Sequence, residues 1–138
     1  MNYKIIAKYI KDIKFEIPSP KVFFLLAKNI SNYKINIDIK SNQFKENIIE
    51  VQTTLSLDPI KNNFEKINTK IIYSTIIELV GEINKKEMEE IILIKVPSKI
   101  YPDLREVFVF TFKHSGFKDI KIDEKVDFKK LYDTSRVQ

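Results

Sequence analysis

The side chains that carry out most enzyme chemistry are scarce in this sequence. It has no cysteine, and His114 is its only histidine. The lack of cysteine excludes a disulfide framework, a thiolate zinc site and a cysteine nucleophile. The two glycines, Gly81 and Gly116, are too few for a dinucleotide fingerprint or a phosphate-binding loop. We therefore expect no enzyme activity, no catalytic residue, no cofactor and no bound metal.

The remaining candidates for chemistry are a group of carboxylates and the single histidine. Glu87, Glu89 and Glu90 could be interpreted as a catalytic or metal-binding cluster, but their spacing is also typical of a solvated helix face. His114 follows Lys113, and two cations at the end of a helix interact favourably with its dipole. We favour the structural interpretation for both groups.

The chain is basic, with 24 lysines and arginines against 19 acidic residues and a net charge of +5. Such a balance suits a nucleic-acid or acidic-membrane surface, or it reflects lysines spread along the chain and solvated. Only Arg105 and Arg136 are arginines, the residue best suited to grip phosphate with two hydrogen bonds. We favour solvated lysines, and expect no nucleic-acid partner and no direct membrane insertion.

The 138 residues suffice for one compact domain, which we expect to span residues 1–138. Residues 1–14 alternate lysine with apolar residues, so we expect no export signal there. The apolar runs fall far short of the roughly 18 residues that a membrane-spanning helix needs. A cytoplasmic protein is the expectation.

Apolar residues alternate with polar ones in four segments, at residues 3–17, 33–40, 49–57 and 67–80. A period of two with many β-branched and aromatic residues predicts strands. We expect an antiparallel, meander-like sheet, with residues 21–30 as an irregular or helical-turn link. In the first strand, Ile6 and Ile10 interrupt the alternation. Its apolar face would carry Tyr3, Ile5, Ala7, Tyr9, Ile13, Phe15 and Ile17.

The pattern changes to a helical period after Asn84, which is a suitable N-cap. We expect Pro97 to end this helix and Pro102 to begin a second helical segment that ends near Gly116. Residues 107–112 have the composition of a strand and the spacing of a helix, so the local pattern leaves both open. We also expect a short terminal helix at residues 127–132, which Asp127 caps.

Several landmarks in this order resemble the SecB family of bacterial export chaperones. The resemblance covers residues 9–132. Its opening motif is Tyr9, Lys11, Asp12, Ile13, Phe15, Glu16 and Pro18. Its later motif is Pro97, Tyr101, Pro102, Arg105 and Glu106. Gly116–Phe117 and residues 126–132 are similar to the family's C-terminal end.

The resemblance implies an α+β fold, with a four-stranded antiparallel sheet packed against a long broken helix and a short C-terminal helix. It favours helix for residues 107–112, and it implies a homotetramer built as a dimer of dimers. A helix that is apolar nearly all round needs a second subunit to cover it as well as its own sheet. The expected oligomer interface is Tyr73, Thr75, Ile77, Val107, Phe108 and Phe112, each of which could instead be ordinary core.

The resemblance also implies a function: an ATP-independent holdase that binds unfolded preproteins in apolar grooves and keeps them export-competent. Exposed apolar surface on a soluble oligomer captures the apolar segments of an unfolded chain. Any one of the candidate groove residues could instead be core. They are Ile35, Ile37, Ile39, Phe117, Ile120, Ile122, Phe128 and Leu131.

The family hands its clients to the export motor SecA through acidic residues on the open side of its sheet. Asp12 and Glu16 match these positions, and Ile72 stands where the family has an apolar residue. Ser74, however, stands where the family has an acidic residue. A SecB-like chaperone dedicated to one client, such as an antitoxin, is therefore an alternative. A basic nucleic-acid-binding protein that uses Tyr3, Tyr9 and surface lysines is another.

Overall fold

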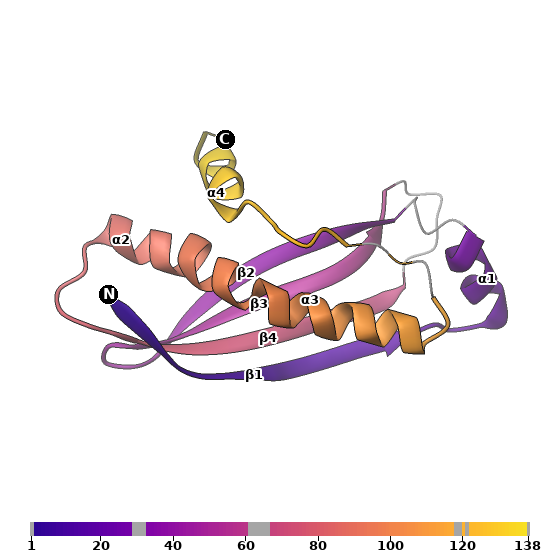
Figure 1. Ribbon diagram of the computed structural model, residues 1–138, viewed down its shortest axis with the longest axis horizontal. Coiled ribbons are helices and arrows are strands. Elements are labelled where there is room, and N and C mark those ends of the chain that lie inside the picture. The colour runs from indigo at the N-terminus through magenta and orange to yellow at the C-terminus, as the bar shows by residue number, and fades with distance from the viewer. Residues whose placement is uncertain (1, 29–32, 61–66, 118–119, 121, 138) are drawn as a thin grey trace.

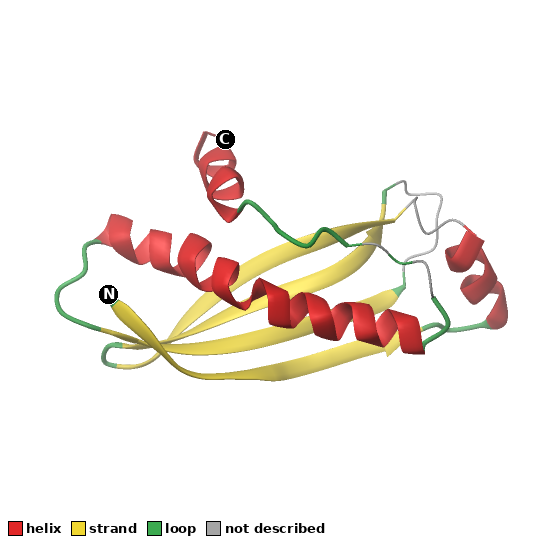
Figure 2. Cartoon of the chain, viewed as in Figure 1, coloured by secondary structure: helices red, strands yellow, loops and turns green. Residues whose placement is uncertain are grey.

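The structure is a computed structural model that describes residues 2–28, 33–60, 67–117, 120 and 122–137. One antiparallel sheet forms the base of the molecule, and a long helix runs along one of its faces (Figure 1). A linker then returns over the same face to a short terminal helix (Figure 2). The predicted α+β architecture is confirmed.

The sheet has the strand order β1-β4-β3-β2. Its strands are β1 (Tyr3–Glu16), β2 (Tyr33–Lys45), β3 (Ile48–Pro59) and β4 (Asn68–Leu79). Only β2 to β4 form a meander, and β1 pairs antiparallel with β4. The prediction of a simple meander was wrong because a longer connection after β1 carries the chain to the far edge of the sheet, as in a Greek key. Both β1 and β2 are edge strands.

Strand β1 contains two bulges, with Ile6 and Lys11 as the extra residues. Each bulge shifts the alternation of side chains by one residue. Between the bulges the two faces are therefore exchanged: Lys8 and Ile10 lie on the face that the long helix covers, and Tyr9 lies on the other face. The predicted faces were wrong for this short segment. After the second bulge, the residues are back on their predicted faces.

The long helix is continuous and consists of α2 (Lys85–Glu90), a π-helical turn η2 (Ile91–Lys95) and α3 (Val96–His114). The expected break at Pro97 is absent from it, and Pro102 lies inside α3. Proline lacks an N–H, but Pro97 sits at the start of α3, directly after a turn that pairs residues five apart. There the Val96 N–H donates to the Ile91 carbonyl. Residues 107–112 are helical, as the family resemblance implied.

Two short helices flank this arrangement. Most of the segment 21–30, predicted as an irregular or helical-turn link, belongs to α1 (Pro20–Lys28), which buries Val22 and Leu26 one turn apart, and residues 29 and 30 lie outside the described residues. The terminal helix α4 (Phe128–Val137) begins where Asp127 accepts a hydrogen bond from the Lys130 N–H at 3.0 Å. Asn84 caps α2 in the same way, accepting from the Glu87 N–H at 2.8 Å. Both predicted N-caps are confirmed.

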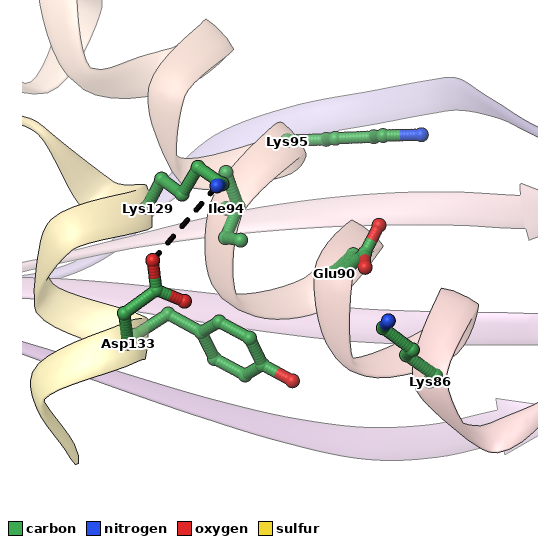
Figure 3. Close-up of a pocket in the computed structure, with 7 residues that line it drawn as sticks. Lys86, Glu90, Ile94, Lys95, Lys129 and Asp133 are labelled. Atoms are coloured by element: carbon green, nitrogen blue, oxygen red, sulfur yellow. Dashed lines mark ion pairs between the residues drawn. The ribbon is translucent and has the colours of Figure 1, made fainter. Parts of the chain in front are cut away.

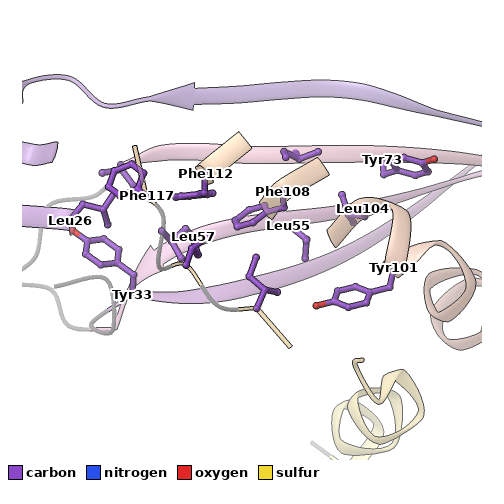
Figure 4. Close-up of a cluster of buried hydrophobic side chains, with 14 of the residues drawn as sticks. Leu26, Tyr33, Leu55, Leu57, Tyr73, Tyr101, Leu104, Phe108, Phe112 and Phe117 are labelled. Carbon is purple, nitrogen blue, oxygen red and sulfur yellow. The ribbon is translucent and has the colours of Figure 1, made fainter. Parts of the chain in front are cut away.

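The main hydrophobic core lies between the sheet and α3 (Figure 4). Leu104, Phe108 and Phe112 on one side of α3 meet Leu55 and Tyr73 from the central strands. A second cluster under the π-helical turn contains Val51, Ile77, Ile91 and Val96. The opposite face of the sheet, called the open face below, carries polar side chains of all four strands. Among the described helices, none combines the length and apolar character that a membrane span requires.

Candidate functional site

An apolar groove of about 400 Å³ runs along the inner side of edge strand β2. Its floor comes from β2 and α3, and its other wall comes from Ile122, Asp123 and Val126 of the linker and from Leu131 of α4. Every second side chain of β2 points into the groove, so Tyr33, Ile35 and Ile37 lie side by side in it. We call it the β2 groove, and its lining residues are Tyr33, Ile35, Ile37, Tyr101, Ile122, Asp123, Val126 and Leu131.

Two side chains of α3 hold the linker in place as the wall of the β2 groove. The Tyr101 hydroxyl donates to the Asp123 carbonyl at 2.7 Å, and Arg105 Nε donates to the Ile122 carbonyl at 3.2 Å. Burial raises the pKa of Tyr101, so its hydroxyl stays protonated and remains a donor. The linker is thus fixed through its backbone at Ile122 and Asp123.

Four of the eight residues predicted for client binding line the β2 groove: Ile35, Ile37, Ile122 and Leu131. Ile39, on the same face of β2, is half-buried against the core. Phe117, Ile120 and Phe128 are buried in the core instead. The phenyl ring of Phe117 contacts those of Phe15, Phe23 and Phe112, and Phe128 contacts Tyr101.

Sequence reasoning missed four lining residues of the groove: Tyr33, Tyr101, Asp123 and Val126. Tyr33 carried a usable signal, because it continues the alternation of Ile35 and Ile37 by one step. Asp123 and Val126 carried none, since their position depends on the hydrogen bonds that α3 makes to the linker backbone.

The carboxylates of α2 take part in structural contacts. A polar pocket of about 380 Å³ lies between α2, η2 and α4, where Lys129 and Asp133 form an ion pair of 3.9 Å (Figure 3). Beside it, the Tyr132 hydroxyl donates to Glu89 at 2.8 Å and ties α4 to the long helix. Over the described part of the chain, no group of three or more histidine, cysteine, aspartate or glutamate residues is arranged to hold a metal ion.

Most of the predicted interface residues are already covered within the chain. Tyr73, Thr75 and Ile77 on β4, and Phe108 and Phe112 on α3, are buried between the sheet and the helix. Val107 is half-buried and faces an open hollow of about 550 Å³ between β1 and α3.

Large apolar side chains remain exposed on β1 and α3, and two of them, Ile10 and Phe110, line that hollow. Ile6, Ile10 and Ile13 on β1 are exposed, and Phe110 on α3 has 62% of its surface exposed. The Lys8 ammonium reaches across from β1 to the Asp103 carboxylate on α3 at 2.8 Å. His114 packs its ring on that of Phe110, with 4.2 Å between the ring centroids. We call Ile6, Ile10, Ile13 and Phe110 the β1–α3 patch.

The open face carries both predicted acidic residues. Asp12 lies opposite Ile72 and Glu16 opposite Asn68, with Lys14 between them opposite Lys70. Acidic and basic side chains therefore alternate along this edge.

Further along the open face, the neighbouring strand β3 supplies another carboxylate. Ser74, where the family resemblance implies an acidic residue, donates its hydroxyl to Glu50 on β3 at 2.6 Å. A negative charge thus lies beside Ser74, although it comes from a different strand.

A four-stranded sheet backed by one long helix, with an open apolar groove at its edge, defines an α+β class of protein with a surface suited to extended chains. Comparison with known proteins identifies the particular family. Residues 1–138 match the family model described as "Preprotein translocase subunit SecB". The chain belongs to the SecB family.

Individual relatives agree with this assignment. A putative protein-export protein SecB from Pelagibacter ubique is 42% identical over 132 residues, covering 95% of this chain and 94% of that protein. The protein-export protein SecB of Anaplasma marginale (strain Florida) is 25% identical, covering 94% of this chain and 79% of the relative. Among solved structures, the Mycobacterium tuberculosis Rv1957 SecB-like chaperone in complex with a ChAD peptide from the Rv1956 HigA1 antitoxin has a similar fold. Its TM-score is 0.62 at 10% identity, over 88% of this chain and 90% of that one.

Proposed function

We propose that this protein is a protein-export chaperone that acts as an ATP-independent holdase in the cytoplasm. It binds unfolded preproteins and keeps them competent for export. The observation that carries the proposal is the β2 groove, an open surface lined mainly by apolar side chains. The relatives named as protein-export proteins support the same function.

The groove offers an unfolded chain two kinds of contact. Ile35, Ile37 and Leu131 present apolar surface, which an exposed apolar segment of a client covers at a gain of about 25 cal/mol per Å². Strand β2 is also an edge of the sheet, so the backbone along its free side can pair with an extended client. Neither contact requires a particular client sequence, and neither requires ATP.

The test is suppression of aggregation, followed by light scattering of an unfolded client without ATP. Leu131→Gln, at an exposed groove residue, should weaken suppression by about threefold to tenfold, since one apolar contact is lost. Val80→Gln is the matched control, because Val80 is equally exposed and lies outside the groove. If the unchanged protein fails to suppress scattering, the holdase proposal is wrong. If Leu131→Gln and Val80→Gln behave alike, the groove is the wrong site.

We extend the proposal to the hand-over of clients to the SecA motor through Asp12 and Glu16. Both side chains belong to the open face, roughly 13 Å apart along β1. Their position leaves the groove free while a partner is bound on the other face. The double substitution Asp12→Ala/Glu16→Ala should reduce SecA affinity without changing client binding. Unchanged SecA affinity, measured by titration calorimetry, would exclude this docking site.

A second candidate function is a chaperone dedicated to one client. Ser74 at the family's acidic position is the observation that favours it, because SecA docking then has one acidic contact fewer on β4. Co-purification of bound clients from the native host separates the two. A broad set of preproteins supports the general export chaperone, and a single recurring client supports the dedicated one.

We also propose that the protein is a homotetramer, a dimer of dimers. The β1–α3 patch supports this assembly, since Ile10 and Phe110 are exposed at the hollow between β1 and α3, and Ile6 and Ile13 are exposed on the same strand β1. A second copy is the occupant that we expect there, as in the family that the chain belongs to.

A further inference from the structure

Two buried threonines divide the hydrophobic interior of the molecule. On β3, Thr53 lies between Val51 of the second cluster and Leu55 of the main core, all on the same face. The neighbouring strand β4 has Thr75 at the same boundary, directly opposite Val51. The boundary between the two clusters is therefore polar on both central strands. We call Thr53 and Thr75 the threonine seam.

The hydroxyls of the threonine seam are buried without compensation. Both residues have 0% of their surface exposed, and among the described residues neither hydroxyl has a hydrogen-bond partner. A buried hydroxyl that makes no hydrogen bond destabilises the closed structure, and it regains its hydrogen bonds as soon as water reaches it. The seam therefore favours states in which the two clusters separate.

The long helix changes its hydrogen bonding at the same boundary. Val96 belongs to the second cluster and Ile100 to the main core. The Val96 N–H donates five residues back, to the Ile91 carbonyl, and Pro97 after it has no N–H to add to the ladder. Prolines and π-helical turns are the usual sites of bends in helices. The helix can therefore bend where the interior is divided.

The part of the long helix before this bend is weakly anchored. It consists of α2 and η2, residues 85–95, and we call it the flap (Figure 1). All of its residues are described, and only Ile91 is buried. Met88 and Ile92 are partly buried against the second cluster. A segment with so little buried apolar surface opens locally more easily than a core helix does.

Side-chain hydrogen bonds also hold the flap closed. Asn2 Nδ2 donates to Glu87 at 2.7 Å, and the Tyr132 hydroxyl donates to Glu89 at 2.8 Å. Water replaces these partners once the flap opens, because carboxylates are readily hydrated. The two bonds therefore limit the opening without preventing it.

We propose that the flap opens independently of the main core and uncovers a latent apolar surface that binds an apolar segment of an unfolded client. The client segment then takes the place of Ile91 on the sheet. The latent surface is the part of the second cluster that belongs to β3 and β4: Ile49, Val51 and Ile77.

The latent surface is continuous with the β2 groove. Ile39 follows Ile35 and Ile37 on the same face of β2, and it packs against both the main core and the second cluster. A client chain that leaves the groove past Ile37 therefore reaches the second cluster next. This inference rests on the proposed holdase function, and it adds a second client surface that is closed in the absence of a client.

Hydrogen exchange of the full-length protein without a client tests the opening itself. The double substitution Thr53→Val/Thr75→Val replaces each hydroxyl by a methyl group of similar size, so it should slow exchange of the flap amides about tenfold to a hundredfold. Thr69→Val is the matched control. Thr69 is also buried and its hydroxyl has no partner among the described residues, but it lies opposite Phe15, away from the seam.

The control should leave exchange in the flap unchanged. Equal slowing by Thr69→Val would overturn the role of the seam. Faster exchange in the double variant would do so too, since the hydroxyls would then be hydrogen-bonded. Pro97→Ala is a second, independent variant that restores an N–H to the helix, and it should slow flap exchange about threefold to tenfold. Unchanged flap exchange in both variants would reject the independent opening.

The methyl group of Met88 reports whether a client uses the latent surface. The chain has two methionines, Met1 and Met88, so the NMR signal of Met88 is readily assigned. The probe is reduced, carboxymethylated α-lactalbumin, a chain that stays unfolded. We expect the Met88 signal to move to its solvent-exposed position as this client saturates the protein. The affinity of the Thr53→Val/Thr75→Val variant for the client should fall about threefold to tenfold.

The outcomes separate this proposal from the holdase function itself. A client that binds while the Met88 signal stays in place overturns the latent surface and leaves the β2 groove as the client site. A client that does not bind at all rejects both the holdase function and the latent surface. Movement of the Met88 signal that the seam variant weakens supports the proposal.

Discussion

Glu50 links the open face to a pH dependence of stability. Its carboxylate has a pKa lowered from 4.5 to about 2, mainly by the Ser74 hydroxyl and then by Gln52 and Lys11. A lowered pKa in the folded state means that the charged form stabilises the fold above the unfolded pKa. That contribution is lost as the pH falls through the folded pKa.

Glu50→Gln should consequently lower the free energy of unfolding by about 1–2 kcal/mol at pH 7, after allowance for screening by water. The gap between the two proteins should shrink as the pH falls from about 4.5 to about 2. Urea denaturation at a fixed protein concentration, repeated along this pH range, measures the gap. A gap of the same size at both ends of the range would contradict the assigned cause.

Gly116 offers a second prediction for a single residue. Its φ is +101°, and an added Cβ would lie 3.0 Å from Cε2 of the Phe23 ring. That ring is held against Phe117, with 4.9 Å between the centroids, so it cannot simply move aside. Gly116→Ala should therefore destabilise the fold by about 1–3 kcal/mol, through both the backbone strain and the clash.

Gly81 is the matched control for Gly116, because its φ of +75° is also positive but an added Cβ would meet nothing within 4 Å. Gly81→Ala should cost only about 1 kcal/mol, the backbone term alone. Thermal unfolding of the two variants compares them directly. Equal losses would mean that the contact between Gly116 and Phe23 is not tight.

At the scale of the elements, residue patterns predicted which segments become strands and helices more reliably than how they pair. Alternation located the four strands, and the side chains of Asn84 and Asp127 marked two helix starts, because each of these signals is local. The order β1-β4-β3-β2 depends on contacts between distant segments, which local alternation does not encode. The two bulges of β1 escaped detection because the second restores the phase that the first shifts.

The sequence predicted four of the eight residues that line the β2 groove. Ile35 and Ile37 followed from alternation in β2, whereas Ile122 and Leu131 followed only from the family resemblance. Phe117, Ile120 and Phe128 have the same apolar character as the lining residues and are as buried as the lining residue Ile122, but they lie outside the groove. Composition cannot separate the two sets, because the path of the linker is fixed by hydrogen bonds from Tyr101 and Arg105 to backbone carbonyls.

The docking of α4 gives a prediction at this scale. Tyr132→Phe removes the hydrogen bond to Glu89, which is worth about 0.5–1.5 kcal/mol. Hydrogen exchange at the amides of α4 should become roughly threefold to tenfold faster, while exchange in β3 and β4 stays unchanged. Lys129→Gln is the control, because its ion pair with Asp133 is exposed and long, and its loss should change little. Equal effects of the two variants would refute the role of the hydroxyl.

At the scale of the whole molecule, the two edges of the sheet have different surroundings. Edge strand β2 borders the β2 groove, whose far wall is the linker and α4. Edge strand β1 borders the exposed β1–α3 patch, and its two bulges twist and interrupt it. One edge is thus suited to an extended client, and the other to a second copy of the chain. The open face between the two edges remains accessible to a third partner.

The β1–α3 patch makes the last prediction. Phe110 is 62% exposed and lines the hollow between β1 and α3, and covering it in an assembly would stabilise the tetramer by removing apolar surface from water. Phe110→Asp would place a charge in that interface, so the variant should dissociate to dimers or monomers at concentrations where the unchanged protein is a tetramer. Phe24→Asp on α1 is the control, because Phe24 is 68% exposed and lies outside the patch.

Light scattering coupled to size-exclusion chromatography measures the masses of the unchanged protein and of the Phe110→Asp and Phe24→Asp variants. A monomeric unchanged protein would reject the proposed assembly, and dissociation by Phe24→Asp alone would move the interface to α1. Dissociation by Phe110→Asp with retained suppression of client aggregation would carry a further consequence. Since the β2 groove lies within one chain, a single subunit would then hold a client, and the tetramer would add affinity only by placing several grooves along the same unfolded chain.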